Sequence, residues 1–200
     1  HSVFVGGLAG DALSDADHNV AVGYVALSAD QLGSRSTAIG RGALTNQAFT
    51  TATDSNNVAI GFHTGVQNLT GTGLTLVGAN AGENLTSGSN NTFIGHLAGA
   101  GATVTGTLNT SIGYAALFSL SSGSSNVGLG RDSGRSGAPG GNVTTSSGQL
   151  CLGDENITNA HIQVSLTVAS DERDKTDFVD LDLGLDFVKS LEPVTYYWDK

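Results

Sequence analysis

The chain has 200 residues, of which 29 are glycine, only 2 are proline and none is methionine, and its formal net charge is −10. Nucleic-acid affinity comes largely from lysine and arginine, so this acidic balance argues against a nucleic-acid partner. No window approaches the roughly 20 apolar residues that a membrane span needs, and we expect no such span.

A repeat organises the first three quarters of the chain. A short apolar run closed by glycine returns at intervals of 17, 17, 21, 17, 17, 18, 17 and 23 residues. Three residues span only about 10 Å as a strand, so one copy cannot fold alone. The pattern predicts a parallel β-solenoid whose thin interior is filled by these runs. The closing glycines are Gly6, Gly23, Gly40, Gly61, Gly78, Gly95, Gly113, Gly130 and Gly153.

Two stretches lengthen the repeat. Gln47–Asn56 and Ser136–Gln149 carry the extra residues of the two longest intervals and are rich in Thr, Ser, Gly and Asn. Extra length costs little at a solvated corner, so we expect both to be exposed loops that project outward. They are candidates for contact with a glycan or a protein.

No cofactor or metal site is predicted. Cys151 is the only cysteine and lies at the centre of the last apolar run, where we expect a small core residue. His18, His63 and His96 recur near the coil corners without a fixed partner acid. Neither a zinc site nor a catalytic triad is therefore indicated.

The pattern changes near residue 154 and divides the chain into residues 1–153, 154–169 and 170–200. Apolar and polar residues alternate over His161–Val168, which predicts a half-buried strand in the linker 154–169. We expect this linker to run along the axis of a trimer and to intertwine with its counterparts. Leu183–Ser190 is compatible with one short helix, and Val194–Trp198 with a strand after Pro193. Because the chain starts mid-repeat without methionine, we expect it to be a fragment.

The last segment carries a family resemblance. It begins Ser-Asp-Glu-Arg-Asp-Lys-Thr-Asp-Phe at Ser170 and continues with Leu-Gly-Leu-Asp-Phe-Val at 183–188 and Leu-Glu-Pro-Val-Thr-Tyr-Tyr-Trp at 191–198. This resembles the start of the intramolecular chaperone domain, or peptidase S74, at the C-terminus of trimeric phage tail fibres and tailspikes. The resemblance implies that residues 170–200 form the N-terminal part of an α+β chaperone domain.

The resemblance also implies a chemistry. In that family a serine directly after the scissile bond acts with a lysine five residues later. Ser170 and Lys175 match this spacing, Asp171 and Arg173 match the other fixed positions, and the implied scissile bond joins Ala169 to Ser170. A lysine serves as base only where burial or positive charge lowers its pKa, and Arg173 is placed to supply such a charge or to stabilise the oxyanion. At most this is a single-turnover self-cleavage, and residues 1–169 predict no turnover enzyme.

The repeat has a resemblance of its own. Val20-Ala21-Val22-Gly23 and Asn57-Val58-Ala59-Ile60-Gly61 are similar to the head repeats of trimeric bacterial adhesins. In those proteins each chain winds a left-handed parallel β-roll, and three rolls pack around one axis. The resemblance covers roughly residues 2–153 and implies a homotrimer.

Three functions remain open. The favoured one is a structural, receptor-binding module of a phage tail fibre, located on the virion among other tail proteins and facing a host receptor or glycan. The second is a bacterial surface adhesin, which requires a secretion signal and a membrane anchor. The third is a carbohydrate-active or ice-binding solenoid. Such an enzyme needs clustered acids, and an ice-binding face needs a matched threonine row that is only partly present, at Thr37, Thr75, Thr92 and Thr110.

Overall fold

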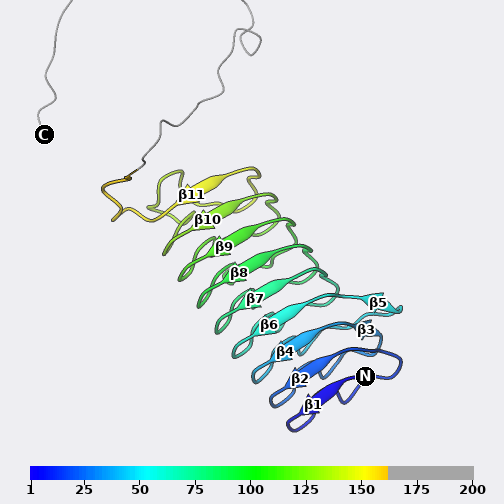
Figure 1. Ribbon diagram of the computed structural model, residues 1–200. Helices are drawn as coiled ribbons and strands as arrows, with labels where there is room; N and C mark the ends of the chain where they lie inside the picture. The colour runs from blue at the N-terminus through cyan, green and yellow to red at the C-terminus, as the bar shows by residue number, and fades with distance from the viewer. Residues whose placement is uncertain (162–200) are drawn as a thin grey trace, which may run out of the picture. The chain divides into compact units, whose positions relative to one another are not determined.

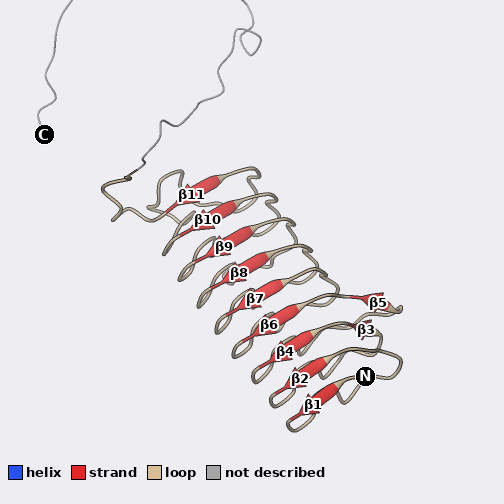
Figure 2. Ribbon diagram, in the orientation of Figure 1, coloured by secondary structure: helices blue, strands red, loops and turns tan. Residues whose placement is uncertain are grey.

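The computed structural model describes residues 1–161, and one compact unit spans His1–Ala160. The chain winds as a β-solenoid in which one short strand of each coil stacks on the strand of the next (Figures 1 and 2). Among the described residues no helix forms. This confirms the predicted all-β solenoid. The strand at 161–168, the short helix and the last strand predicted for the C-terminal segment lie outside the described residues.

The solenoid is held together by a 9-stranded parallel sheet in which each strand pairs with its equivalent one coil on. Equivalent residues stand opposite each other, as Thr75 pairs with Thr92 and Leu76 with Phe93. The strands along this sheet are β1 (Val3–Val5), β2 (Val20–Val22), β4 (Thr37–Ile39), β6 (Val58–Ile60), β7 (Thr75–Val77), β8 (Thr92–Ile94), β9 (Thr110–Ile112), β10 (Val127–Leu129) and β11 (Leu150–Leu152).

Only the middle residue of each strand points into the coil. Leu76 in β7 and Phe93 in β8 are fully buried, as are the alanines at this position in β2, β4 and β6. Cys151 occupies the position in β11, packs in the core as predicted, and has the pKa of its thiol raised by burial. Turns supply the rest of the core cluster, including Leu27, Leu44 and Leu117.

A buried asparagine before most of the strands ties each coil to the next. Asn91 donates through Nδ2 to the carbonyl of Gly106 at 2.8 Å, and its Oδ1 accepts from the backbone N–H of Asn109 at 2.9 Å. Asn109 repeats the arrangement with Gly123 and Asn126. The amide thereby satisfies backbone groups that the narrow interior would leave unpaired, because its two ends supply a donor and an acceptor. Asn19, Asn57 and Asn126 make the equivalent pair of bonds.

The closing glycines are required by the backbone. Gly113 has φ of 134°, and a Cβ added there would lie 2.6 Å from the carbonyl oxygen of Gly130 in the next coil. The corner therefore has neither the conformation nor the space for a side chain. The same close approach to the next coil recurs at the closing glycines from Gly6 to Gly95, which explains why glycine closes these copies of the repeat.

We expect Gly113→Ala to destabilise the solenoid by more than about 3 kcal/mol, because it adds a clash to backbone strain. Gly148→Ala is the matched control: Gly148 also has a positive φ, of 69°, but nothing lies within 4 Å of an added Cβ. It should cost about 1 kcal/mol. Thermal denaturation followed by circular dichroism measures both, and equal losses would contradict the packing argument.

The two long insertions differ in how far their residues are exposed to solvent. Ser136–Gln149 is exposed over most of its length, as expected, with Ala138 and Val143 as buried anchors. Gln47–Asn56 does not simply project, because Gln47, Phe49 and Ser55 are buried. Its strand β5 (Thr53–Asp54) pairs with β3 (Gly33–Ser34) in a small second sheet.

The buried carboxylate of Asp30 fixes this first insertion. It accepts hydrogen bonds from Gln47 Nε2 at 2.6 Å and from the backbone N–H groups of Gly33 and Phe49 at 3.1 and 3.2 Å. Three donors compensate for the loss of water around the carboxylate. The predicted exposure of Gln47–Asn56 therefore holds for six of its ten residues, among them Thr50, Thr51 and Ala52, whereas a buried polar anchor holds the insertion to the preceding coil.

Candidate functional site

The residues predicted to cut the chain lie outside the described residues. Ser170, Lys175, Arg173 and Asp171, and the bond between Ala169 and Ser170, all follow residue 161. Their arrangement therefore stays a prediction. The described surface offers two other features: an apolar face along the main sheet and a polar network near its C-terminal end.

The outer face of the main sheet carries a continuous apolar row. The third residue of every strand in this sheet points away from the core and is valine, isoleucine or leucine. Ile60 is 38% exposed and Ile112 is 40% exposed, and the informative feature is the row that such side chains form rather than any single one of them. The members of this row are Val5, Val22, Ile39, Ile60, Val77, Ile94, Ile112, Leu129 and Leu152.

A second row runs parallel to the first. The first residue of each strand also faces outward and is valine, threonine or leucine. Across the nine strands neither row contains a charged residue. We call these two rows together the strand face. The expectation that the apolar runs fill the interior was thus correct only for the middle residue of each run, because side chains alternate along a strand.

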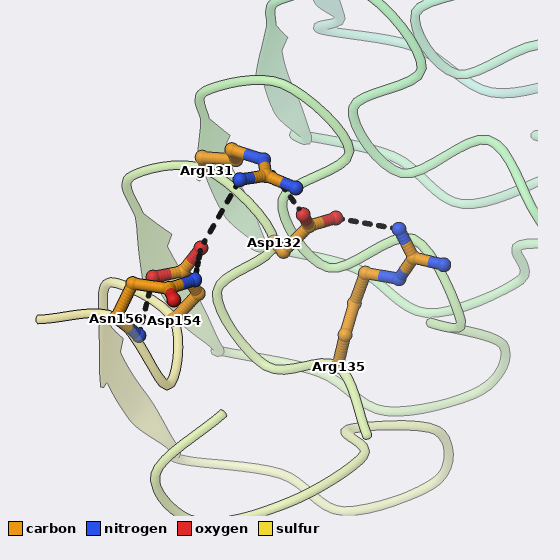
Figure 3. A network of polar contacts seen from close by, with 5 residues as sticks. All are labelled: Arg131, Asp132, Arg135, Asp154 and Asn156. Carbon is orange, nitrogen blue, oxygen red and sulfur yellow. Dashed lines mark hydrogen bonds and ion pairs between the residues drawn. The ribbon is translucent and has the colours of Figure 1, made fainter. Parts of the chain in front are cut away.

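Figure 3 shows a network of charged groups at the last two coils. Arg131 lies between two carboxylates, with its Nε 3.0 Å from Asp132 Oδ2 and its Nη1 3.7 Å from Asp154 Oδ2. Arg135 pairs with the other oxygen of Asp132. Asn156 donates to Asp154 from its backbone N–H at 2.9 Å and from its side-chain amide at 3.1 Å. The network links the turn after β10 to the turn after β11.

The environment of Asp154 favours its charged form. The backbone N–H of Asn156, followed by its side-chain amide and by Arg131, holds the pKa of the Asp154 carboxyl below its usual range, against the opposing effect of burial. A carboxyl whose pKa is lower in the folded than in the unfolded state contributes stability above the unfolded value, near 3.9. That contribution is lost as the pH falls through the folded pKa.

We therefore expect Asp154→Asn to lower the melting temperature at pH 6 and to have a diminishing effect as the pH falls below about 4. The reason is that these hydrogen-bond donors and Arg131 stabilise a carboxylate in the folded protein more than they stabilise the uncharged amide of asparagine. Asp11→Asn, at an exposed position outside the network, is the control and should show no such convergence. Melting curves of the three proteins between pH 6 and pH 2.5 measure the difference. A gap between wild type and Asp154→Asn that persists at pH 2.5 would contradict the assignment.

Other site chemistries find little support in the part of the chain that the structure describes. Residues 1–161 bring together no three His, Cys, Asp or Glu side chains that could hold a metal ion. The same residues include no helix long and apolar enough to cross a membrane. Sequence reasoning missed the strand face, because a three-residue apolar run is too short for its alternation to show which side chains face outward. It also missed the charged network, for which no local motif gives a signal.

Comparison with known proteins adds information at one end of the chain. A family model described as the chaperone of endosialidase, Peptidase_S74, matches residues 170–200. No curated protein and no solved structure matches the chain. The match covers Ser170, Lys175 and the motifs that carry the resemblance. The chain thus joins a parallel β-solenoid to a C-terminal segment similar to the chaperone of endosialidase.

Proposed function

We propose that the chain is part of a homotrimeric phage tail fibre, located on the virion, that contacts the host surface and is assembled by its C-terminal chaperone. The observation that carries this proposal is an uncharged strand face along the whole solenoid, in a chain whose last 31 residues match the chaperone family. The family is associated with trimeric fibres. The strand face and the family match therefore each support a trimeric assembly, independently of the other.

The dimensions of the strand face support association. Eight steps of about 4.8 Å give a length of roughly 40 Å, and a three-residue strand spans about 10 Å, so the face covers on the order of 400 Å². A face of this size, on which only the four threonines are polar, lies within the range of roughly 300–600 Å² of the largest apolar patches on soluble monomers, and such patches are often functional. The absence of charge across the nine strands resembles the core of an interface rather than its rim.

The in-register stacking favours parallel chains around one axis. Each strand repeats at the same position one coil on, so the strand face runs along the stacking direction. Rotation about an axis parallel to that direction brings the same coil of each copy to the same height. Ile60 of one copy then meets Ile60 of the others, and every row is buried at once. A closed symmetric assembly of this kind leaves no strand face uncovered.

The proposal includes a maturation step. The Ser170 hydroxyl attacks the carbonyl carbon of Ala169 while Lys175 accepts the hydroxyl proton. The C–N bond between Ala169 and Ser170 then breaks as Lys175 returns this proton to the Ser170 amine, which leaves an ester between Ala169 and the Ser170 oxygen. Water hydrolyses this ester, releasing an N-terminal product that ends in the Ala169 carboxylate and restoring the Ser170 hydroxyl. Arg173 supplies the positive charge that lowers the pKa of Lys175 or stabilises the oxyanion. Asp171 occupies the remaining fixed position of the motif. The sequence match supports these roles because it includes all four residues. It also favours a phage fibre over a bacterial surface adhesin.

Light scattering on the purified, folded chain tests the assembly. We expect a particle of three chain masses, with parallel chains. A folded particle of one chain mass at micromolar concentration would contradict the proposal, because a strand face of this size should then remain exposed.

A further inference from the structure

A polar hollow of about 280 Å³ opens beside the charged network of Figure 3. It is built from three successive coils: one residue follows β9, four follow β10 and one follows β11. None of the six belongs to a strand, so the hollow does not use the strand face. Its lining residues are Ser119, Asp132, Arg135, Ser136, Asn142 and Glu155.

One side of the hollow is held rigidly. The guanidinium of Arg135 lies 4.8 Å above the ring centroid of Phe118, and its Nη1 donates to Asp132. Asp132 is held in turn by Arg131. Stacking and pairing restrict the Arg135 side chain before any ligand arrives, so its remaining N–H groups are donors that lose little freedom on binding.

The other side offers polar groups that the other described residues do not use. Within residues 1–161, the side chains of Ser119, Ser136, Asn142 and Glu155 make no hydrogen bond or ion pair with another residue. The two hydroxyls and the amide can each donate and accept, and the carboxylate accepts. Four unused groups that converge on one hollow with a fixed guanidinium form a surface for a ligand rich in hydrogen-bonding groups.

The charges around the hollow narrow the class of ligand. The carboxylates of Asp132 and Glu155 disfavour an anion such as phosphate. Arg135, together with Arg131 on the far side of Asp132, disfavours a metal ion, and the described residues hold no cluster of metal ligands. The mainly polar lining gives an apolar group nothing to pack against. An uncharged polyhydroxylated ring is neither an anion, nor a metal ion, nor an apolar group. It also matches the polar lining, because each of its hydroxyls both donates and accepts hydrogen bonds.

We infer that this hollow binds one uncharged monosaccharide unit of a cell-surface glycan. Its volume, at the lower limit for ligand pockets, suits a single ring. The exposed insertion Ser136–Gln149 supplies Ser136 and Asn142, so the longest interval of the repeat serves to build the site. This inference rests on the proposed adhesive function and names its ligand class.

Saturation-transfer NMR on the purified chain tests the inference with four probes: the methyl glycosides of glucose, galactose, mannose and N-acetylglucosamine. We expect at least one to bind with a dissociation constant of about 1 mM, as is reasonable for one ring in an open site. Glu155→Gln and Asn142→Ala should each weaken that binding at least about tenfold, since each removes hydrogen bonds to ring hydroxyls.

Glu83→Gln, the same change outside the hollow, should leave binding unaltered. Melting temperatures confirm that all variants are folded. Failure of all four glycosides to bind, or equal binding by wild type and both hollow variants, would overturn the inference. Light scattering on the same samples tests the trimeric assembly separately from sugar binding. Trimers that bind no sugar would contradict only the inference about the hollow. Single chains that bind sugar would contradict only the proposed trimer.

Discussion

Replacing Ile60 and Ile112 together by aspartate is expected to convert the proposed trimer into single chains. Both side chains point outward from the strand face, at 38% and 40% exposure, so aspartate there leaves the interior of the coil untouched. In the proposed trimer the same positions of three copies meet, and six carboxylates would be brought together away from water. Burying unpaired charges costs several kcal/mol each, enough to weaken association by more than about a thousandfold.

Light scattering measures the effect, and circular dichroism checks that the solenoid is intact. The control is the double substitution Leu8→Asp and Leu69→Asp, which places the same charges at positions that are 52% and 47% exposed but lie outside the strands. That protein should remain trimeric. If the strand-face variant keeps three chain masses and an unchanged melting temperature, the interface lies elsewhere on the solenoid.

The spacing of glycines carried enough information to predict the solenoid. Glycine recurs in the sequence once per coil because the backbone there has a positive φ and lies close to the next coil, as Gly113 does against Gly130. The repeat therefore reveals the length of the coil without any long-range information. Cys151 could be placed in the core for the same reason, since its position relative to Gly153 matches that of Phe93 relative to Gly95.

The direction of each side chain was harder to predict. A three-residue apolar run is too short for its alternation to distinguish a buried strand from one that is apolar on both faces. The run Val58–Ile60 looks uniformly apolar, yet Ala59 alone faces the core. Likewise, the recurrence of Asn57 was visible, but its paired bonds to Gly71 and Leu74 required knowledge of which coils are neighbours.

Sites assembled from several coils leave no local signal. Ser119 and Glu155 are 36 residues apart in sequence and line the same hollow because the coils between them stack in register. Ser170 and Lys175, in contrast, are close in sequence and belong to a recognisable motif. A short segment is therefore enough to propose the cleavage site, which stays a prediction, whereas no short segment indicates the hollow.

In the proposed maturation step the protein cuts itself between Ala169 and Ser170, and Ser170→Ala is expected to abolish this cut. The measurement uses the chain together with the sequence that follows it in its gene, so that any further part of the chaperone is present. Mass spectrometry of the wild type should find two products whose masses sum to that of the intact protein plus one water. Removal of a catalytic nucleophile lowers rates by roughly 10⁶-fold, so Ser170→Ala should remain intact over days. Ser165→Ala, a nearby serine outside the motif, should cut normally.

Lys175 allows a sharper test of the proposed roles. Lys175→Ala removes both the base and the positive charge, whereas Lys175→Arg keeps the charge but cannot be deprotonated at neutral pH. If Lys175 accepts the proton of Ser170, both variants should stay intact, and if only its charge matters, Lys175→Arg should still cut. Both should form trimers, because assembly precedes the chemistry. A wild-type trimer that keeps its intact mass after long incubation would mean that the chaperone segment remains attached and that Ser170 is not a nucleophile.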